Sequence, residues 1–452
     1  MVSSPAPGLP ASARGSRELV RAALLVVLGV ALVGTWCGAA LTWDGASLLF
    51  AFLDVQDVSV PHARLSVALL EYPTLLLSHF TTNVRALELV YGATYTLIPV
   101  VCVLASWRLL RSEHPRLIAW QFVWLCFGAL PGQLFFVTES LIAAHVAWPI
   151  LFAVLTGLPR RAIVPFGLAA AFSFELHPAS SLLLFLVGGA AAATAVGNPE
   201  RRKPLLGAAA FAFVAGAARA WVTLHDPYEL SQAAVQLGAE WDSLRLPGLA
   251  FGAAAVAPFA LVISQLVGPR ATAASLGALT VLAICFGALM VPWASEPRAW
   301  QDELNYRFFA PFVAAPFLVG AAATALATPP DRDALTVRDG LVCVGAAALV
   351  AAVLTVQSAK WLELRRSLES TLSRSTGCIT MSSVRECRGT ALRWWPTPSY
   401  ALLIQGHAPR ALLLPGNECK HARKSTSIPV NPWYARPRNT GWFDLRKTGL
   451  GD

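Results

Sequence analysis

The stretch AALLVVLGVALVGTWCGAALT, residues 22–42, contains no charged side chain. About 20 consecutive apolar residues are enough to cross the hydrocarbon core of a bilayer as a helix. Helix is the expected form because lipid offers no hydrogen-bond partners to an open backbone. The stretch is too long for a signal peptide, and no small-x-small cleavage site follows it. We therefore predict a retained membrane anchor.

The whole chain has the composition of a membrane protein. Of its 452 residues, 56% are hydrophobic and 13% are charged, whereas soluble domains carry about 25% charged residues. A soluble fold this apolar could not cover its surface with polar groups, so lipid must cover it. We predict eleven membrane-spanning helices. They cover residues 19–41, 86–107, 117–136, 139–157, 162–175, 178–197, 205–224, 247–267, 271–293, 306–327 and 339–358.

Basic and acidic residues alternate from one loop to the next. If the N-terminus is inside, the inner loops carry arginine or lysine and the outer loops carry most of the aspartate and glutamate. This alternation predicts a cytoplasmic N-terminus and an extracytoplasmic C-terminus. It also accounts for the net charge of +9 without a nucleic-acid partner. The high usage of Ala, Arg and Leu is typical of a GC-rich bacterium, which would place the chain in the inner membrane.

Three regions follow from these assignments. Residues 1–18 form a cytoplasmic tail, residues 19–359 a transmembrane helical domain, and residues 360–452 a small mixed extracytoplasmic domain. Two outer loops are long, 42–85 and 225–246. The remaining expectations are local. They are a helix at 63–80 that lies in the interface or dips into the membrane, an amphipathic helix at 361–374, and strands at 400–405 and 410–414.

The eight cysteines fall into two groups. Five lie in apolar spans, where a thiol behaves as a small buried hydrophobe. Three, Cys378, Cys387 and Cys419, lie in the extracytoplasmic domain. Their spacing does not match a zinc site. In an oxidising compartment we expect one disulfide with one thiol left over, and we assign the disulfide to Cys378 and Cys387.

Acidic residues in the first outer loop are the first candidates for chemistry, because ionisable groups at the membrane boundary are costly. Asp44 follows the first span directly and could act as a general base or a metal ligand; the alternative is a solvated carboxylate at a helix end. Asp54 and Asp57 could share a metal ion with His62 nearby. The alternative is that they are ordinary loop acids in water.

Two short outer turns hold further candidates. Glu139 follows Thr138 and could face an outer cavity, although it would also stabilise the positive start of a helix. Glu175 and His177 sit in the sequence FELHP, where Glu175 could hold His177 protonated as an acid–base or phosphate-binding pair. The alternative for this second turn is a simple polar connection.

Cations near the outer face are the candidates for binding a phosphate. Arg298, Tyr306 and Arg307 flank the start of the tenth span, and Arg219 lies near the outer end of the seventh. Arginine binds phosphate through two parallel hydrogen bonds. The alternative for these side chains is snorkelling to the membrane interface.

Taken together, these features have a familiar order. An aspartate after the first span, a long first outer loop, a glutamate before the fourth span and the Glu/His-Pro turn resemble the GT-C superfamily of polyprenyl-phosphate-sugar-dependent glycosyltransferases. The resemblance implies an all-α polytopic membrane fold. It also implies an acidic catalytic or metal residue in the first outer loop, for which Asp44 is the best positional match, with Asp54 or Asp57 as alternatives.

The resemblance further implies the reaction and its partners. A carboxylate, with Asp44, Glu139 and Glu175 as candidates, would deprotonate an acceptor hydroxyl. Arginines would stabilise the leaving lipid phosphate, with inversion at the sugar. The partners would be the lipid bilayer and a polyprenyl-phosphate-linked sugar. The cofactor stays open, with a divalent cation such as Mg²⁺ or Mn²⁺ as the candidate.

Two other functions compete with this one. A transporter or flippase for a lipid-linked or envelope component predicts polar residues at mid-membrane and broken spans. A non-catalytic envelope assembly protein predicts that the Trp- and Arg-rich C-terminal region binds partners. Clustering of the ionisable groups on the outer side favours a one-sided active site over transport.

Overall fold

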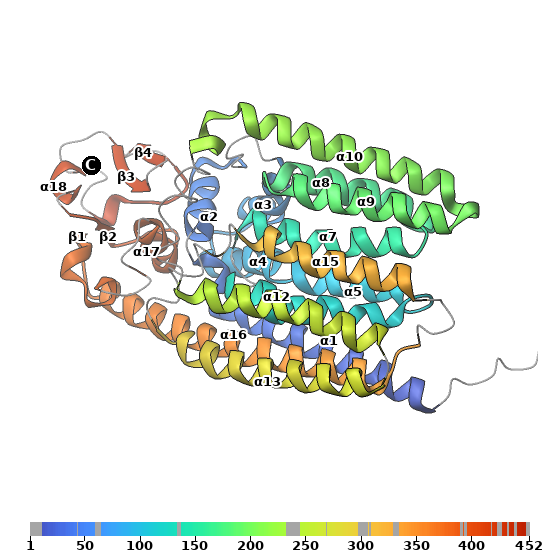
Figure 1. Ribbon diagram of the computed structural model, residues 1–452. Helices are drawn as coiled ribbons and strands as arrows, with labels where there is room; N and C mark the ends of the chain where they lie inside the picture. The colour runs from blue at the N-terminus through green and yellow to red at the C-terminus, as the bar shows by residue number, and fades with distance from the viewer. Residues whose placement is uncertain are drawn as a thin grey trace, which may run out of the picture.

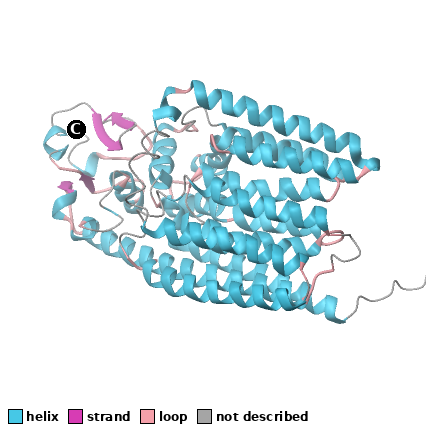
Figure 2. Ribbon diagram, in the orientation of Figure 1, coloured by secondary structure: helices cyan, strands magenta, loops and turns pink. Residues whose placement is uncertain are grey.

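The computed structural model describes most of the chain as a bundle of long helices with a small domain at one end (Figures 1 and 2). The start of α1 lies at the other end of the bundle. We call the end that carries the small domain the tail end. The described residues are 11–42, 44–58, 65–132, 137–231, 245–267, 269–296, 306, 309–328, 334–388, 392, 396–416, 418–422, 427–431, 434–437 and 441–448.

Helices cover nearly all of the described parts of the predicted spans, so the prediction of an all-α polytopic membrane fold is confirmed. Seven described helices are long and apolar enough to cross a bilayer, and Glu139–Leu155 and Gly252–Leu266 are shorter apolar helices. Eleven crossings therefore remain a prediction. The bundle helices are α1 (Ala11–Cys37), α4 (Val84–Thr96), α5 (Ile98–Leu110), α6 (Ile118–Trp124), α7 (Glu139–Leu155), α8 (Arg160–Leu176), α9 (Ser180–Gly197), α10 (Arg202–His225), α12 (Arg245–Leu266), α13 (Pro269–Trp293), α15 (Ala310–Ala327) and α16 (Val337–Ser373).

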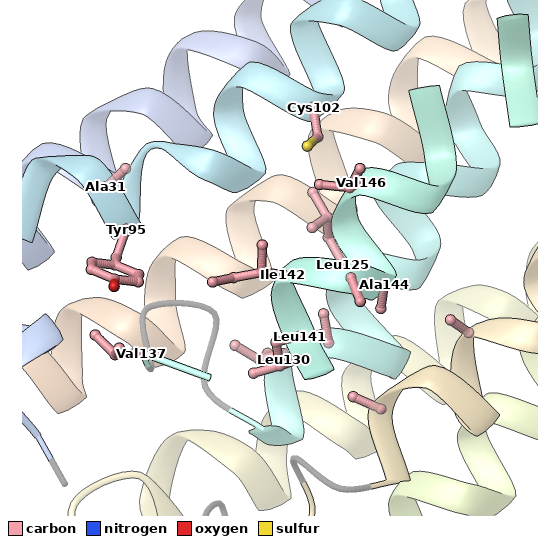
Figure 3. Packing of buried hydrophobic residues seen from close by; sticks show 14 of the residues in the cluster. Ala31, Tyr95, Cys102, Leu125, Leu130, Val137, Leu141, Ile142, Ala144 and Val146 are labelled. Atoms are coloured by element: carbon pink, nitrogen blue, oxygen red, sulfur yellow. The ribbon is translucent and has the colours of Figure 1, made fainter. Parts of the chain in front are cut away.

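Large aromatic residues fill the centre of the bundle. Trp120, Trp124 and Trp148 are fully buried on α6 and α7, and Figure 3 shows the aliphatic neighbours that pack around this region. The outward faces of the helices instead expose large apolar side chains, such as Leu168 on α8 and Val214 on α10. A soluble protein does not expose so much apolar surface, and a bilayer would cover it.

A partly buried ion pair lies at the end of the bundle away from the tail. Arg116 contacts the carboxylate of Asp339 at 3.2 Å. Asp339 also accepts from the backbone of Thr336, whose hydroxyl in turn accepts from the Asp339 amide, which makes a capping box at the start of α16. Two orphan donors of the helix start are thereby satisfied.

Two shorter helices, α2 (Asp44–Val55) and α3 (Leu65–Ser78), lie at the tail end (Figure 1). The helix predicted within residues 63–80 corresponds to α3 and is confirmed, whereas its position at the membrane interface stays a prediction. Its two faces are inverted relative to a soluble helix. Large apolar side chains are exposed on one face, and the opposite face buries polar ones. The exposed side chains are Leu65, Leu69, Tyr72 and Leu76, and the buried polar ones are Ser66, Glu71, Thr74 and Ser78.

The small domain begins inside a helix and contains little sheet. α16 runs without a break across the predicted boundary at 359/360. Strand β1 (Gly377–Thr380) pairs in parallel with β2 (Ala411–Leu414), which confirms the strand predicted at 410–414. The other elements are α17 (Thr397–Gln405), α18 (Glu418–Ala422), and the antiparallel pair β3 (Ser427–Asn431) and β4 (Tyr434–Pro437).

The strand predicted at 400–405 is wrong, because these residues belong to α17. Prolines at the start of α17 suit the first turn of a helix, where no amide hydrogen bond is lost. Residues 397–403 are all buried, so they lack the alternation of buried and exposed residues that a half-buried strand would have. Tyr400 packs on Trp361 of α16, with ring centroids 5.0 Å apart.

The predicted disulfide between Cys378 and Cys387 is also wrong. Cys378 on β1 is bonded to Cys419 on α18, with the two Cα atoms 5.6 Å apart. The reason is long-range pairing, because β2 lies beside β1 and α18 follows β2 directly. Cys387 is the thiol left over, and burial raises its pKa to about 12. The prediction that the three cysteines of this domain form one disulfide and leave one free thiol is confirmed.

A glutamate joins the small domain to α16. The Glu386 carboxylate accepts hydrogen bonds from the hydroxyls of Ser367 at 2.5 Å and Thr371 at 3.2 Å. Partial burial would by itself raise the pKa of Glu386, but these hydrogen bonds and nearby Arg385 hold it below its ordinary value.

Candidate functional site

The start of α2 and the residues before α7 meet at the tail end, beside the predicted catalytic acids Asp44 and Glu139. After α1, Gly38 adopts a left-handed conformation (φ 76°), which glycine reaches without strain and which turns the chain toward α2. A Cβ at Gly45 would lie 1.8 Å from the carbonyl oxygen of Ala40 and 3.0 Å from Val137. Only glycine therefore lets the start of α2 lie this close to the carbonyl of Ala40 and to Val137, which lies two residues before α7. This contact brings Asp44 and Glu139 onto neighbouring segments.

Three carboxylates lie near two tyrosines of α4 in this region. Glu71 interacts electrostatically with the hydroxyls of both Tyr91 and Tyr95. Asp44 interacts with Tyr91, and Glu139 with Tyr95. The two tyrosine rings are buried and their centroids are 4.9 Å apart; Figure 3 shows Tyr95 projecting from its helix into the core. We call these five residues the acidic–tyrosine cluster.

The members of the cluster differ in their access to solvent. Glu71 is fully buried, whereas Asp44 and Glu139 are half-buried. Asp44 and Glu139 are therefore partly accessible from outside the protein, and Glu71 is not. The sequence did not single out Glu71 as a candidate. Its spacing from Thr74 and Ser78, at i+3 and i+7, would have shown that it belongs to a polar face.

The predicted Glu175–His177 pair lies in the turn between α8 and α9. Glu175 lies in the last turn of α8, and His177 follows that helix directly. The Nδ1 atom of His177 accepts a hydrogen bond from the amide of Ala179 at 3.2 Å. A protonated imidazole has no lone pair for this bond. This contact caps the turn between α8 and α9, and the pairing of His177 with Glu175 stays a prediction.

The predicted phosphate-binding residues are spread over separate contacts. Arg219 is buried in α10 and lies 3.8 Å from Glu229, so it forms an ion pair instead of snorkelling. Tyr306 is fully buried and its hydroxyl donates to the carbonyl of Gly128 at 2.9 Å. Arg298 and Arg307 lie outside the described residues.

The two candidate metal ligands in the first loop have unlike surroundings. Asp54 is buried, and its carboxylate accepts from the amide of Phe443 at 3.2 Å, which anchors the small domain on α2. Asp57 is exposed and accepts from the amide of Val58. His62 lies outside the described residues. Within the part of the chain that the structure describes, no group of three His, Cys, Asp or Glu side chains is placed to hold a metal ion.

A cationic cavity that sequence reasoning missed lies where α1, α4, α16 and α17 meet. It has a volume of about 610 Å³. Four arginines line it, and we call it the arginine pocket. Its lining residues are Trp36, Arg85, Leu362, Arg365, Arg366, Glu369, Leu372, Ser373, Ile404, Gln405, Ala408 and Arg410. The local signal was present, because Arg365 and Glu369 are one helical turn apart, but nothing in the sequence brings Arg85 to them.

Two carboxylates, one buried and one partly exposed, organise the inner wall of the arginine pocket. Glu88 is almost fully buried and contacts Arg365 at 2.8 Å and Arg85 at 3.1 Å. Arg365 also contacts Glu369 at 2.7 Å. Arg85 additionally donates to the carbonyl of Trp36 and lies over its ring, 5.3 Å from the centroid. These contacts join α1, α4 and α16.

A further polar group lies in the interior of the bundle. His145 and Gln121 are buried on α7 and α6, and their side-chain nitrogens have no hydrogen-bond partner among the described residues. The His145 ring meets Trp124 edge-on at 4.8 Å. Directly after Trp124 the helix becomes a π-helix over Leu125–Ala129, a feature frequent at functional sites.

Comparisons with protein-family models, with curated proteins and with solved structures found no match for this chain.

Proposed function

We propose that the chain is an integral membrane glycosyltransferase of the GT-C type, which transfers a sugar from a lipid-phosphate-linked donor to an acceptor at the tail end of the bundle. The observation that carries the proposal is the acidic–tyrosine cluster. Its carboxylates come from α2, α3 and α7 and gather at the membrane boundary, where ionisable groups are costly unless they serve a function.

The residues have distinct roles in the proposed reaction. Asp44 is the general base that takes the proton from the acceptor hydroxyl, with Glu139 as the second half-buried acid beside it. The acceptor oxygen then forms a bond to the anomeric carbon. The bond from that carbon to the phosphate oxygen breaks, and the lipid phosphate leaves with the electron pair. Buried Glu71, with Tyr91 and Tyr95, holds the polar surroundings of this site in place.

A divalent cation is not included in these steps. The described donor residues do not fit one, because they offer no group of three metal-ligating side chains. Asp54, one of the two first-loop candidates, is already engaged by the amide of Phe443.

The tail end is proposed to face the outside of a bacterial inner membrane. The charge alternation of the loops supports this orientation. The Cys378–Cys419 disulfide in the small domain supports it independently, because disulfides persist in oxidising compartments.

The test is release of lipid phosphate from a panel of polyprenyl-phosphate-linked hexoses and pentoses by the full chain in lipid nanodiscs. Asp44→Asn should lower the rate by about 100-fold or more, the contribution of a general base. Glu200→Gln, an exposed acid at the far end of α9, should leave the rate unchanged. The proposal fails if no donor reacts, or if both variants have the same rate.

A second candidate function, transport of a lipid-linked component, is favoured by the buried group of Gln121, Trp124 and His145. Polar side chains inside a bundle often line a translocation path. Flux of a labelled polyprenyl-phosphate sugar across a proteoliposome membrane, lost in His145→Leu but not in Asp44→Asn, would favour transport over transfer.

A further inference from the structure

The arginine pocket lies at the level of the lipid headgroups. Trp36, in the last turn of α1, is 61% exposed, and the same helix exposes Leu25, Leu32 and Val33 below it. This apolar face is where lipid chains would lie. Tryptophan at the end of a span marks the membrane–water interface. The pocket therefore opens beside the polar ends of neighbouring lipids.

The pocket carries an excess of positive charge. Four guanidinium groups line it, and the carboxylates that neutralise them in its wall are Glu88 and Glu369. These two engage Arg85 and Arg365. Arg366 and Arg410 are exposed at the rim, and neither forms a salt bridge with any described residue. This excess of positive charge favours an anion as the ligand.

The shape and chemistry of the cavity fit a phosphate ester. A volume of about 610 Å³ lies within the range of small-molecule sites. Guanidinium groups bind phosphate oxygens through paired hydrogen bonds. Leu362, Leu372 and Ile404 supply an apolar wall for the part of a ligand next to its phosphate.

We propose that the arginine pocket binds the phosphate group of a lipid headgroup, with Arg366 and Arg410 as the rim cations that engage the phosphate and Trp36 beside the start of the acyl chains. The proposal does not depend on sugar transfer, because none of its residues belongs to the acidic–tyrosine cluster. It assigns a lipid-binding role to the junction between the bundle and the small domain.

The experiment measures binding of a short-chain phosphatidylglycerol to the full chain in mild detergent, by native mass spectrometry and by thermal shift. A diacylglycerol of the same acyl length is the phosphate-free probe, and inorganic phosphate is the lipid-free probe. The pocket variant is Arg366→Gln/Arg410→Gln. The matched control is Arg374→Gln/Arg388→Gln, which removes the same charge from exposed arginines outside the pocket.

The pocket variant should bind phosphatidylglycerol at least ten-fold more weakly, because two charge-assisted hydrogen-bonding partners are lost. The control variant should stay within about two-fold of the parent chain, and the diacylglycerol should not bind. Equal affinity of the two variants, or equal binding of the phosphate-free lipid, would overturn the proposal. Binding of inorganic phosphate without phosphatidylglycerol would overturn the lipid source and assign the pocket to a soluble phosphate.

Discussion

Glu88→Gln tests whether the buried ion pair between α4 and α16 stabilises the junction of bundle and small domain. Glu88 is 2% exposed and Arg365 is 7% exposed. The amide keeps the size of the side chain but removes the charge that faces Arg365 at 2.8 Å and Arg85 at 3.1 Å. Removing one member of a buried pair costs about 3–5 kcal/mol, because the other charge stays buried without compensation. We expect about 3 kcal/mol, since Glu369 still contacts Arg365 at 2.7 Å.

Glu369→Gln is the matched control, because Glu369 contacts the same guanidinium from a side chain that is 37% exposed. A partly exposed pair contributes about 0–1 kcal/mol, since water screens it and hydrates the released charge. The assay is the free energy of unfolding of the micelle-embedded chain in a denaturant titration followed by tryptophan fluorescence. If Glu369→Gln destabilises the chain as much as Glu88→Gln does, burial is not what makes the pair strong, and the reasoning is refuted.

Three further predictions concern the small domain and the start of α2. Cys419→Ser should destabilise the small domain by about 4 kcal/mol, because the disulfide closes a loop with a 41-residue separation. It should also make the Cys378 thiol reactive toward a maleimide under non-reducing conditions, and peptide mass mapping measures this labelling. Partial burial would raise the pKa of Glu386, but its hydrogen bonds to α16 outweigh this effect and lower the pKa. The carboxylate therefore stabilises the fold above pH 4.5, and this contribution is lost as the pH falls below that value. Glu386→Gln should accordingly flatten the acid side of a profile of thermal stability against pH. Gly45→Ala should cost about 1–3 kcal/mol of unfolding free energy, because its Cβ would lie 1.8 Å from a carbonyl oxygen, whereas Gly29→Ala, which meets nothing within 4 Å, should not destabilise the chain.

The positions of the helices follow from local sequence. A run such as residues 22–42 becomes a helix in lipid because its own backbone groups must pair with each other, whatever the rest of the chain does. The same local rule located α3, although Pro73 and Glu71 interrupt its apolar pattern. Hydropathy also separated the small domain from the bundle. It did not predict that α16 continues across this boundary, because the helix passes from apolar to charged residues without a break.

The clusters were decided by tertiary structure. Glu71 belongs to the acidic–tyrosine cluster only because α3 packs its polar face toward Tyr91 and Tyr95. The disulfide partner of Cys378 depended on the parallel pairing of β1 with β2, which brings α18 beside it. Such pairings join residues far apart in the chain, and no local pattern encodes which partners will meet.

The arginine pocket shows most clearly which features local sequence determines and which depend on tertiary packing. From the sequence alone, Arg85 is the last residue of an outer loop and Arg365 lies on an amphipathic helix, 280 positions away by the printed numbering. Membrane insertion, which each apolar segment determines for itself, brought both to the same end of the bundle. Their meeting around Glu88 required the packing of α4 against α16, because only there does a buried carboxylate offset the cost of taking two guanidinium groups out of water.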